Sequence, residues 1–225
     1  MPRMVIVLVL ASLSLPPWAT ASVEIAHYPL LSDGLDTTGN NDPMTLENAP
    51  FQDGGVYCNG VYWNSSDPDR YLVETPYLES LDFEAFAISA EFKISQHTYR
   101  CPVFVGGHTG RWMGVETQLD GTISLLYNNS TVVPSSEVVS LDEWHRALIT
   151  YDGATDVGNL YLDGRLACSA TFVIEHVDRR NISTQNFSNG LAFEGYFREL
   201  IVYDGPFVPA PVGAATWGGM KALFR

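Results

Sequence analysis

Short runs of alternating apolar and polar residues, each ended by a turn-forming dipeptide, restrict the fold of this chain more than any other feature. Residues 144–164 (WHRALITYDGATDVGNLYLDG) hold two such runs, and each run ends in Asp-Gly. In the first run Ala147, Ile149 and Tyr151 share one face of an expected strand. Asp-Gly pairs favour tight reversals because both residues accept a positive φ. The stretch therefore predicts an antiparallel hairpin.

The same pattern recurs along the chain. Residues 87–94 predict a strong strand with Ile88, Ala90, Phe92 and Ile94 facing inward. Turn signals return about every 8 to 12 residues, and helical periodicity is missing from the sequence. We therefore predict an all-β protein, a sandwich of two antiparallel sheets, each burying one apolar face.

The domain organisation follows from both ends of the sequence. Residues 1–21 have a basic start, a twelve-residue apolar-leaning run and a small-x-small end (Ala19-Thr20-Ala21), which is typical of a secretory signal peptide. The alternative is a membrane anchor, but a span needs about 20 apolar residues. We expect a secreted, extracellular protein without a membrane span after cleavage, a domain over 22–204, and a proline-containing tail over 205–225.

The charge of the chain narrows its partners. The formal net charge is −14, with 26 acidic and 12 basic residues and no basic run. Such a surface repels nucleic acid and anionic membrane. It is compatible with a cationic partner or a divalent metal, and also with a role in solubility alone.

Cys58, Cys101 and Cys168 remain in the predicted mature chain. One disulfide and one leftover thiol is the default expectation in an oxidising compartment, and the spacing does not tell which pair forms. Buried free thiols are the alternative, because each cysteine lies in or beside a strand-like run.

Asn-x-Ser/Thr sequences predict N-glycosylation if the protein passes through a eukaryotic secretory pathway. The predicted acceptors are Asn64, Asn129, Asn181 and Asn186.

Three segments carry a family resemblance. They are residues 144–153 (WHRALITYDG), 160–164 (LYLDG) and 191–204 (LAFEGYFRELIVYD). These segments resemble the hairpin and the last strand of laminin G-like domains in the concanavalin A-like superfamily. The resemblance spans about residues 23–204 and implies a jelly-roll sandwich. Lectins, laminin G modules and polysaccharide-cleaving enzymes share this fold, so the fold alone does not decide the function.

The resemblance also implies a calcium ion. Residues 36–40 (DTTGN) are similar to the family's D-x-S-G-N loop, which in some members is bridged to the final strand through a metal. Carried over by position, the ligands are Asp36, Asn40 and Glu199, which supply the oxygen donors that Ca²⁺ prefers. The alternative is an Asx-turn loop in which the side chains bind their own backbone.

Glucanases on this fold share an E-x-D-x-x-E strand, which places carboxylates side by side. The nearest segment here is 116–120 (ETQLD), in which Gln118 replaces the central acid. We therefore expect that the chain is not an enzyme.

The same segment suggests a ligand-binding face. Trp112, Glu116 and Gln118 alternate on one side of a predicted strand, and an aromatic ring beside hydrogen-bonding groups suits a sugar ring. The alternative is a core face, because a two-residue turn at Asp120-Gly121 would place apolar residues on the same side. Trp144 is expected in the core.

The sequence thus favours a secreted, non-catalytic binding module for a glycan or an extracellular glycoprotein. A protein-binding adhesion module and a polysaccharide-cleaving enzyme are the alternatives.

Overall fold

The computed structural model describes residues 22–60, 71–97, 100–107, 112–128, 131–175, 178–186 and 191–205. The predicted signal peptide, the tail after Gly205, and the predicted glycosylation sites Asn64 and Asn129 lie outside these residues. Within the described ranges, no helix is long and apolar enough to cross a bilayer.

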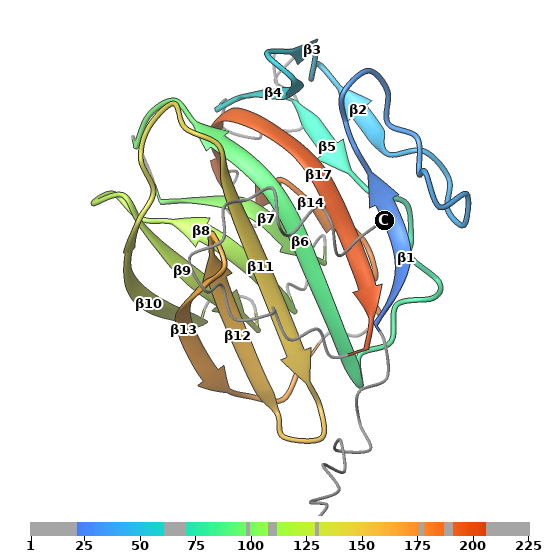
Figure 1. The fold of residues 1–225 in the computed structure, drawn as a ribbon, viewed down its shortest axis with the longest axis vertical. Coiled ribbons are helices and arrows are strands. Elements are labelled where there is room, and N and C mark those ends of the chain that lie inside the picture. Colours follow the sequence, from blue (N-terminus) through green and yellow to red (C-terminus); the bar gives the residue numbers. More distant parts are fainter. Residues whose placement is uncertain are drawn as a thin grey trace, which may run out of the picture.

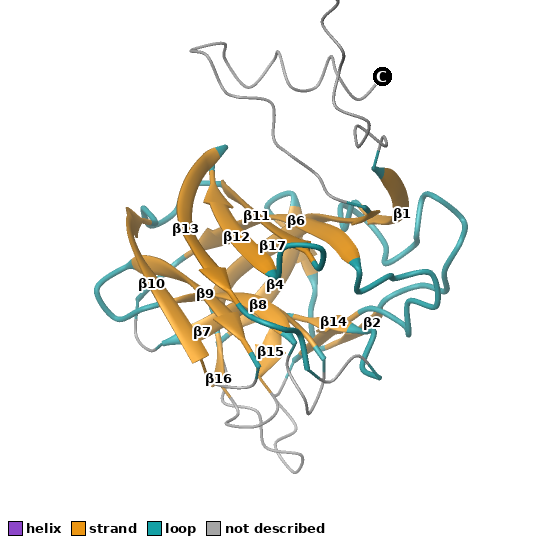
Figure 2. Ribbon diagram, turned by 90° about the horizontal axis from the view of Figure 1, so that it is seen from below, coloured by secondary structure: helices purple, strands orange, loops and turns teal. Residues whose placement is uncertain are grey.

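The described residues form a two-layered antiparallel sandwich, as the sequence predicts (Figures 1 and 2). The first sheet, here sheet A, runs β13-β12-β11-β6-β17-β4-β3, and β1 also pairs with β17. The second, sheet B, runs β10-β9-β8-β7-β14-β5-β2, and β15 and β16 form a small ribbon.

The strands of sheet A are β1 (Val23–Tyr28), β3 (Phe51–Gln52), β4 (Gly55–Asn59), β6 (Ala85–Ile94), β11 (His145–Asp152), β12 (Val157–Leu162), β13 (Arg165–Thr171) and β17 (Glu194–Asp204). The strands of sheet B are β2 (Thr45–Glu47), β5 (Leu72–Glu74), β7 (Cys101–Gly106), β8 (Met113–Thr117), β9 (Thr122–Tyr127), β10 (Thr131–Val138) and β14 (Ile182–Ser183). The ribbon consists of β15 (Gln185–Asn186) and β16 (Leu191–Ala192).

Strand β6 shows how the alternating pattern builds the core. Ile88, Ala90, Phe92 and Ile94 are fully buried between the sheets, as predicted. The intervening side chains point to the outer face of sheet A, because successive side chains on a strand alternate between faces. Strand β11 continues the arrangement, since Ala147 to Tyr151 pair in register with Ala90 to Phe86.

Trp144 lies on the outer face of sheet A and not in the core. Trp144 precedes His145, whose ring packs beside the core residue Phe92. Alternation therefore turns Trp144 outward, where it is half-buried and its ring lies over the guanidinium of Arg198. Trp144 is thus not a core residue, contrary to the sequence-based expectation.

All three cysteines are free thiols, so the default expectation of one disulfide is wrong. Cys58 and Cys101 are buried, as the alternative predicts, whereas Cys168 is half-buried. Burial raises the pKa of Cys58 to about 12 and that of Cys101 to about 11. Burial also raises the pKa of Cys168, which is only partly exposed on β13. Thiols react as thiolates, and these environments disfavour the thiolate.

We therefore expect the folded protein to react slowly with Ellman's reagent at about pH 8. After unfolding in guanidinium chloride, all 3 cysteines should react. A single reactive thiol in the unfolded, unreduced protein would instead indicate a disulfide.

Candidate functional site

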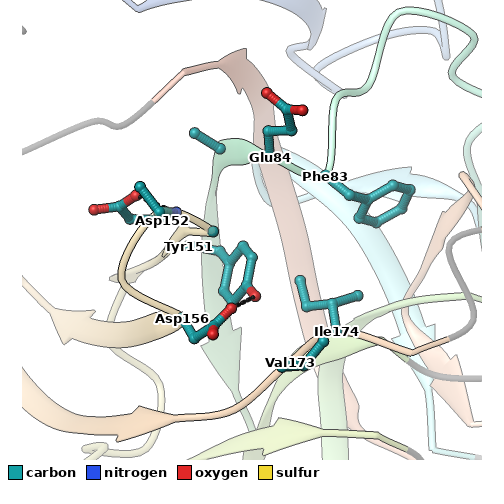
Figure 3. Close-up of a pocket in the computed structure, with 10 residues that line it drawn as sticks. Phe83, Glu84, Tyr151, Asp152, Asp156, Val173 and Ile174 are labelled. Carbon is teal, nitrogen blue, oxygen red and sulfur yellow. Dashed lines mark hydrogen bonds between the residues drawn. The ribbon is translucent and has the colours of Figure 1, made fainter.

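A pocket of about 590 Å³ opens at one end of the sandwich, where the β11–β12 loop meets the entry to β6. In Figure 3, Phe83 lies on one side of this pocket, and Tyr151 and Asp156 lie across from it. Ten described residues line it: Phe83, Glu84, Ala85, Tyr151, Asp152, Gly153, Ala154, Asp156, Val173 and Ile174.

The floor of the pocket is held by hydrogen bonds of Tyr151. Its hydroxyl oxygen lies 3.1 Å from Asp156 Oδ1 and 3.2 Å from the Phe172 carbonyl oxygen, and its one hydrogen is shared between these two acceptors. Its ring stacks on Phe86 with centroids 5.7 Å apart. Burial first, and then the hydrogen bond to Asp156, raise the pKa of Tyr151. The hydroxyl therefore stays protonated and anchors Asp156 at the pocket wall.

The β11–β12 loop is shaped by the Asp-Gly turn that the sequence predicts. Asp152 caps the loop by accepting hydrogen bonds from the Ala154 amide and the Thr155 hydroxyl, both at 3.0 Å. The Gly153 amide donates to the Glu84 carbonyl at 2.7 Å. A Cβ at Gly153 would lie 2.7 Å from that same oxygen, so only glycine lets the loop approach β6 this closely.

The third wall is the segment that follows β13. The Asn128 side chain donates to the Val173 carbonyl at 2.8 Å and accepts from the Glu175 amide at 3.0 Å, which fixes this segment. Val173 is 65% exposed and offers an apolar rim to the pocket.

Acidic and aromatic side chains line the pocket. Glu84, Asp152 and Asp156 contribute carboxylates, Phe83 and Tyr151 contribute rings, and no basic side chain is among the described residues that line it. Carboxylates accept hydrogen bonds from hydroxyl groups, and aromatic faces pack against C–H groups. Carboxyl groups are also the groups that glycoside hydrolysis requires.

The predicted ligand face on β8 is corrected by the structure. Trp112 is fully buried, and its ring meets Phe83 and Phe86 edge-on with centroids 5.0 and 5.1 Å apart. Glu116 is only 2% exposed and is paired with Arg100 and Gln118. Trp112 points into the core and Glu116 to the outer face, so Trp112, Glu116 and Gln118 do not form one exposed surface.

The alternative prediction, that Glu116 shares a core face with the apolar residues after the turn, also differs from the structure. Glu116 pairs with Ser124, whereas Ile123 and Leu125 pair with Thr117 and Val115 on the core side. The turn at Asp120-Gly121 is longer than two residues, because the Gln118 amide bonds the Thr122 carbonyl at 2.8 Å.

The carboxylate of Asp36, a predicted metal ligand, accepts hydrogen bonds mainly from residues of its own loop. Its two oxygens accept from the amides of His27, Thr38, Asn40 and Asn41 and from the Thr38 hydroxyl and the Asn41 side chain, over 2.7 to 3.2 Å. A carboxylate has roughly four lone-pair positions, so six donors use all of them. This is the Asx-turn arrangement, the sequence-based alternative to a metal site.

Calcium binding stays a prediction that melting experiments decide. Among the described residues, no three His, Cys, Asp or Glu side chains group as a metal site would require. We expect Asp36→Ala to lower the free energy of unfolding by about 1–3 kcal/mol, because the loop amides lose a charged acceptor. The loss should be equal with and without calcium. A calcium-induced rise in melting temperature that Asp36→Ala removes would instead support the metal site.

Glu199, the third predicted ligand, lies in a bulge of β17 and pairs with His27 at 3.1 Å. This hydrogen bond raises the pKa of His27 and lowers the pKa of Glu199. Asp36 holds the His27 amide, so the structure brings Asp36 and Glu199 to the same residue.

The His27–Glu199 pair predicts a pH dependence. A raised His27 pKa gives stability that is complete below its ordinary value of 6.5 and is lost as pH rises through the raised value. A lowered Glu199 pKa gives stability that is present above its ordinary value of 4.5 and is lost as pH falls. The stability difference between wild type and His27→Gln should therefore be largest between these values, which urea unfolding at several pH values measures. A difference that is constant up to about pH 9 would contradict this.

Two of the predicted glycosylation sites lie in the described residues. The side-chain amide of Asn181 donates to Glu74, so this nitrogen is already engaged in the folded protein. Asn186 belongs to strand β15.

Comparisons with known proteins agree with the fold. A family model described as the concanavalin A-like lectin/glucanases superfamily matches residues 69–213. Domain 4 of AbnA, a GH43 extracellular arabinanase from Geobacillus stearothermophilus solved with arabinotriose, is 19% identical with a TM-score of 0.63. The match covers 86% of this chain and 98% of that domain. No relative was found among curated protein sequences.

A second similar structure is a sialidase from Trypanosoma rangeli. It is 14% identical with a TM-score of 0.66, and the match covers 83% of this chain and 31% of the sialidase. The chain therefore spans about a third of that enzyme.

These findings correct the expectation that the chain is not an enzyme. The similar structures are a domain of an arabinanase and about a third of a sialidase, so this fold occurs within enzymes. The missing E-x-D-x-x-E strand excludes only one arrangement of carboxylates, and three acidic residues line the pocket at Tyr151.

Proposed function

Because this chain belongs to the concanavalin A-like lectin/glucanases superfamily, we propose that it acts on carbohydrate and binds a saccharide in the pocket beside Tyr151. The observation that carries this proposal is the composition of the pocket lining, which combines two aromatic rings with three acidic residues, of which Asp156 lies against the Tyr151 hydroxyl. A saccharide offers hydroxyl donors and apolar C–H faces, and this lining complements both.

The comparisons support a carbohydrate ligand. The arabinanase domain that shares the fold was solved with arabinotriose, and the sialidase is named for action on a sugar. A protein ligand would need a larger surface than this pocket.

Cleavage of the bound saccharide is the second candidate function, and the carboxylates of the pocket favour it. Glycoside hydrolysis uses one carboxyl group as acid and a second as nucleophile or base. Glu84, Asp152 and Asp156 are the residues of the pocket that could take these roles.

The test measures binding and product formation on the same samples. The full chain is titrated calorimetrically with arabino-, xylo- and cello-oligosaccharides and with sialyllactose, and each mixture is then analysed for released sugars. Asp156→Asn should weaken binding about tenfold, because a hydrogen bond to a charged acceptor contributes about 1.5–3 kcal/mol. Glu137→Gln, on β10 and away from the pocket, is the matched control.

Released sugars that disappear in Glu84→Gln or Asp152→Asn would establish catalysis. Binding without product would support recognition alone. Absence of binding to every saccharide would overturn the proposal, and binding that is equal in wild type and Asp156→Asn would remove the pocket from it.

A further inference from the structure

The outer face of sheet A carries a row of aromatic side chains that the pocket does not use. Lys93 pairs with Tyr196, and Tyr196 pairs with Tyr57, so these three lie side by side on β6, β17 and β4. The Trp144 indole lies beside these three residues, since its ring is 5.6 Å from the Lys93 ammonium and also contacts Arg198 on β17 and Gly55 on β4. The strands are neighbours in the order β11-β6-β17-β4, and Trp144 directly precedes β11 (Figure 1). We call Trp144, Lys93, Tyr196 and Tyr57 the aromatic row.

The rings of the row are held at defined positions. The Tyr57 and Tyr196 centroids are 5.3 Å apart, and the Lys93 ammonium lies 4.2 Å from the Tyr196 ring. The Arg198 guanidinium lies 3.8 Å from the centre of the Trp144 ring. Trp144 also packs on Gly55, where a Cβ would lie 2.9 Å from the indole. The absence of a side chain at Gly55 thus lets the indole approach the sheet this closely.

A row of charged residues lies beside the aromatic row and fixes the position of Arg198 under Trp144. Arg146, Glu91 and Arg198 face one another across β11, β6 and β17. Both guanidiniums donate to Glu91, one to each oxygen, at 2.8 Å. Arg198 also donates to the Gly54 carbonyl at 3.1 Å. Arg198 is therefore fixed on two sides and serves as a rigid base for Trp144.

The charges around the aromatic row nearly cancel. Asp53 hydrogen-bonds to Tyr196 and thereby raises its pKa, and Asp142 contributes to the same shift. The Tyr57 hydroxyl lies 3.5 Å from Glu194. The cations Lys93, Arg146 and Arg198 thus meet the carboxylates Glu91, Asp53, Asp142 and Glu194. In a chain of net charge −14, this near balance favours a neutral partner over a cationic or an anionic one.

We propose that the aromatic row is a second carbohydrate-binding surface, which takes a neutral saccharide chain in an extended conformation. Sugar rings pack their C–H faces on Trp144, Tyr196 and Tyr57, and the ring hydroxyls bond to the charged groups beside them. Lys93, Tyr196 and Tyr57 lie on three adjacent strands that are about 4.8 Å apart, and Trp144 lies beside them, so the surface contacts more than one sugar unit. This inference rests on the proposed function as far as the ligand class is concerned, but it assigns a separate site.

Affinity electrophoresis in gels that contain arabinoxylan, hydroxyethyl cellulose or arabinan tests this site with the full chain. Polygalacturonate serves as the charged comparison. Tyr57→Ala and Tyr196→Ala should each weaken binding to the neutral polymers about threefold to tenfold, as expected for the loss of one aromatic contact. Trp144→Leu should do the same while filling the space over Gly55.

Tyr161→Ala is the matched control, because Tyr161 is a half-buried tyrosine on the outer face of the same sheet, beside Leu148 and outside the row. Far-UV circular dichroism and melting temperatures show whether each variant is folded. The control should bind as the wild type does.

The outcomes separate the two sites. If Asp156→Asn weakens binding and the row variants do not, the second site is overturned and the pocket stands. If the row variants weaken binding and Asp156→Asn does not, the result supports the second site and contradicts saccharide binding in the pocket. Tighter binding of polygalacturonate that salt abolishes would overturn the neutral ligand, and absence of binding to all polymers would overturn both proposals.

Discussion

Gly195→Ala is expected to lower the free energy of unfolding by about 3 kcal/mol or more, because the new methyl group has no space in the sheet. A Cβ at Gly195 would lie 2.0 Å from the Lys93 carbonyl oxygen and 3.0 Å from the Ile94 Cα. Both contacts are with the backbone of the neighbouring strand, so no side chain can move aside. The residue also has φ +154°, which L side chains rarely adopt.

Urea unfolding followed by tryptophan fluorescence measures this change. Gly39→Ala is the control, because Gly39 also has a positive φ of +73° but nothing lies within 4 Å of its Cβ position. The control should cost about 1 kcal/mol, the conformational penalty alone. Equal losses in the two variants would show that contact with β6 is not the cause.

Trp112→Ala should cost about 3–5 kcal/mol, as for other large buried aromatic side chains. The ring is fully buried, packs edge-on against Phe83 and Phe86, and donates its N–H to the Arg179 carbonyl. The variant leaves a cavity in the core and an unpaired carbonyl at its edge. Chemical unfolding gives the loss of stability.

Truncation of Trp112 should also disturb the pocket, because Phe83 rests on the indole and lines that cavity. Saccharide binding measured below the melting temperature should therefore weaken as well. Leu119→Ala is the control for stability, since Leu119 is 67% exposed and should change it by less than about 0.5 kcal/mol. A loss under about 1 kcal/mol for Trp112→Ala would contradict the described packing.

Local alternation was enough to predict the layers of the fold. Residues 87–94 and 144–151 each show period two with apolar residues on one side, and both became central strands of sheet A with those sides in the core. Local alternation failed at Trp112. The strand β8 begins one residue later, and Gly106 on β7 leaves room for the indole, with only 2.1 Å between the ring and a hypothetical Cβ. That space depends on the pairing of two strands, which one segment does not reveal.

The candidate sites depend on tertiary register for the same reason. The pocket joins Phe83 and Glu84 to a loop nearly 70 residues later, and the sequence pattern identifies that loop only as a turn. Tyr151 was predicted to share one face with Ala147 and Ile149, and it does belong to the core with them. Its hydroxyl, however, supports the pocket. One feature of the sequence could have marked this loop as part of a site. Asp152 and Asp156 flank Gly153, and a tight turn does not need two acidic residues.

The pairing of β1 with β17 has a mechanical consequence. Val23 is opposite Asp204, and the described parts of the chain begin and end at this corner of sheet A. Tension applied between these two points would load the outermost hydrogen bonds first and open the pair progressively, as a zipper opens. The domain should therefore yield at low force by peeling β1 from β17, while the sandwich behind it is still intact.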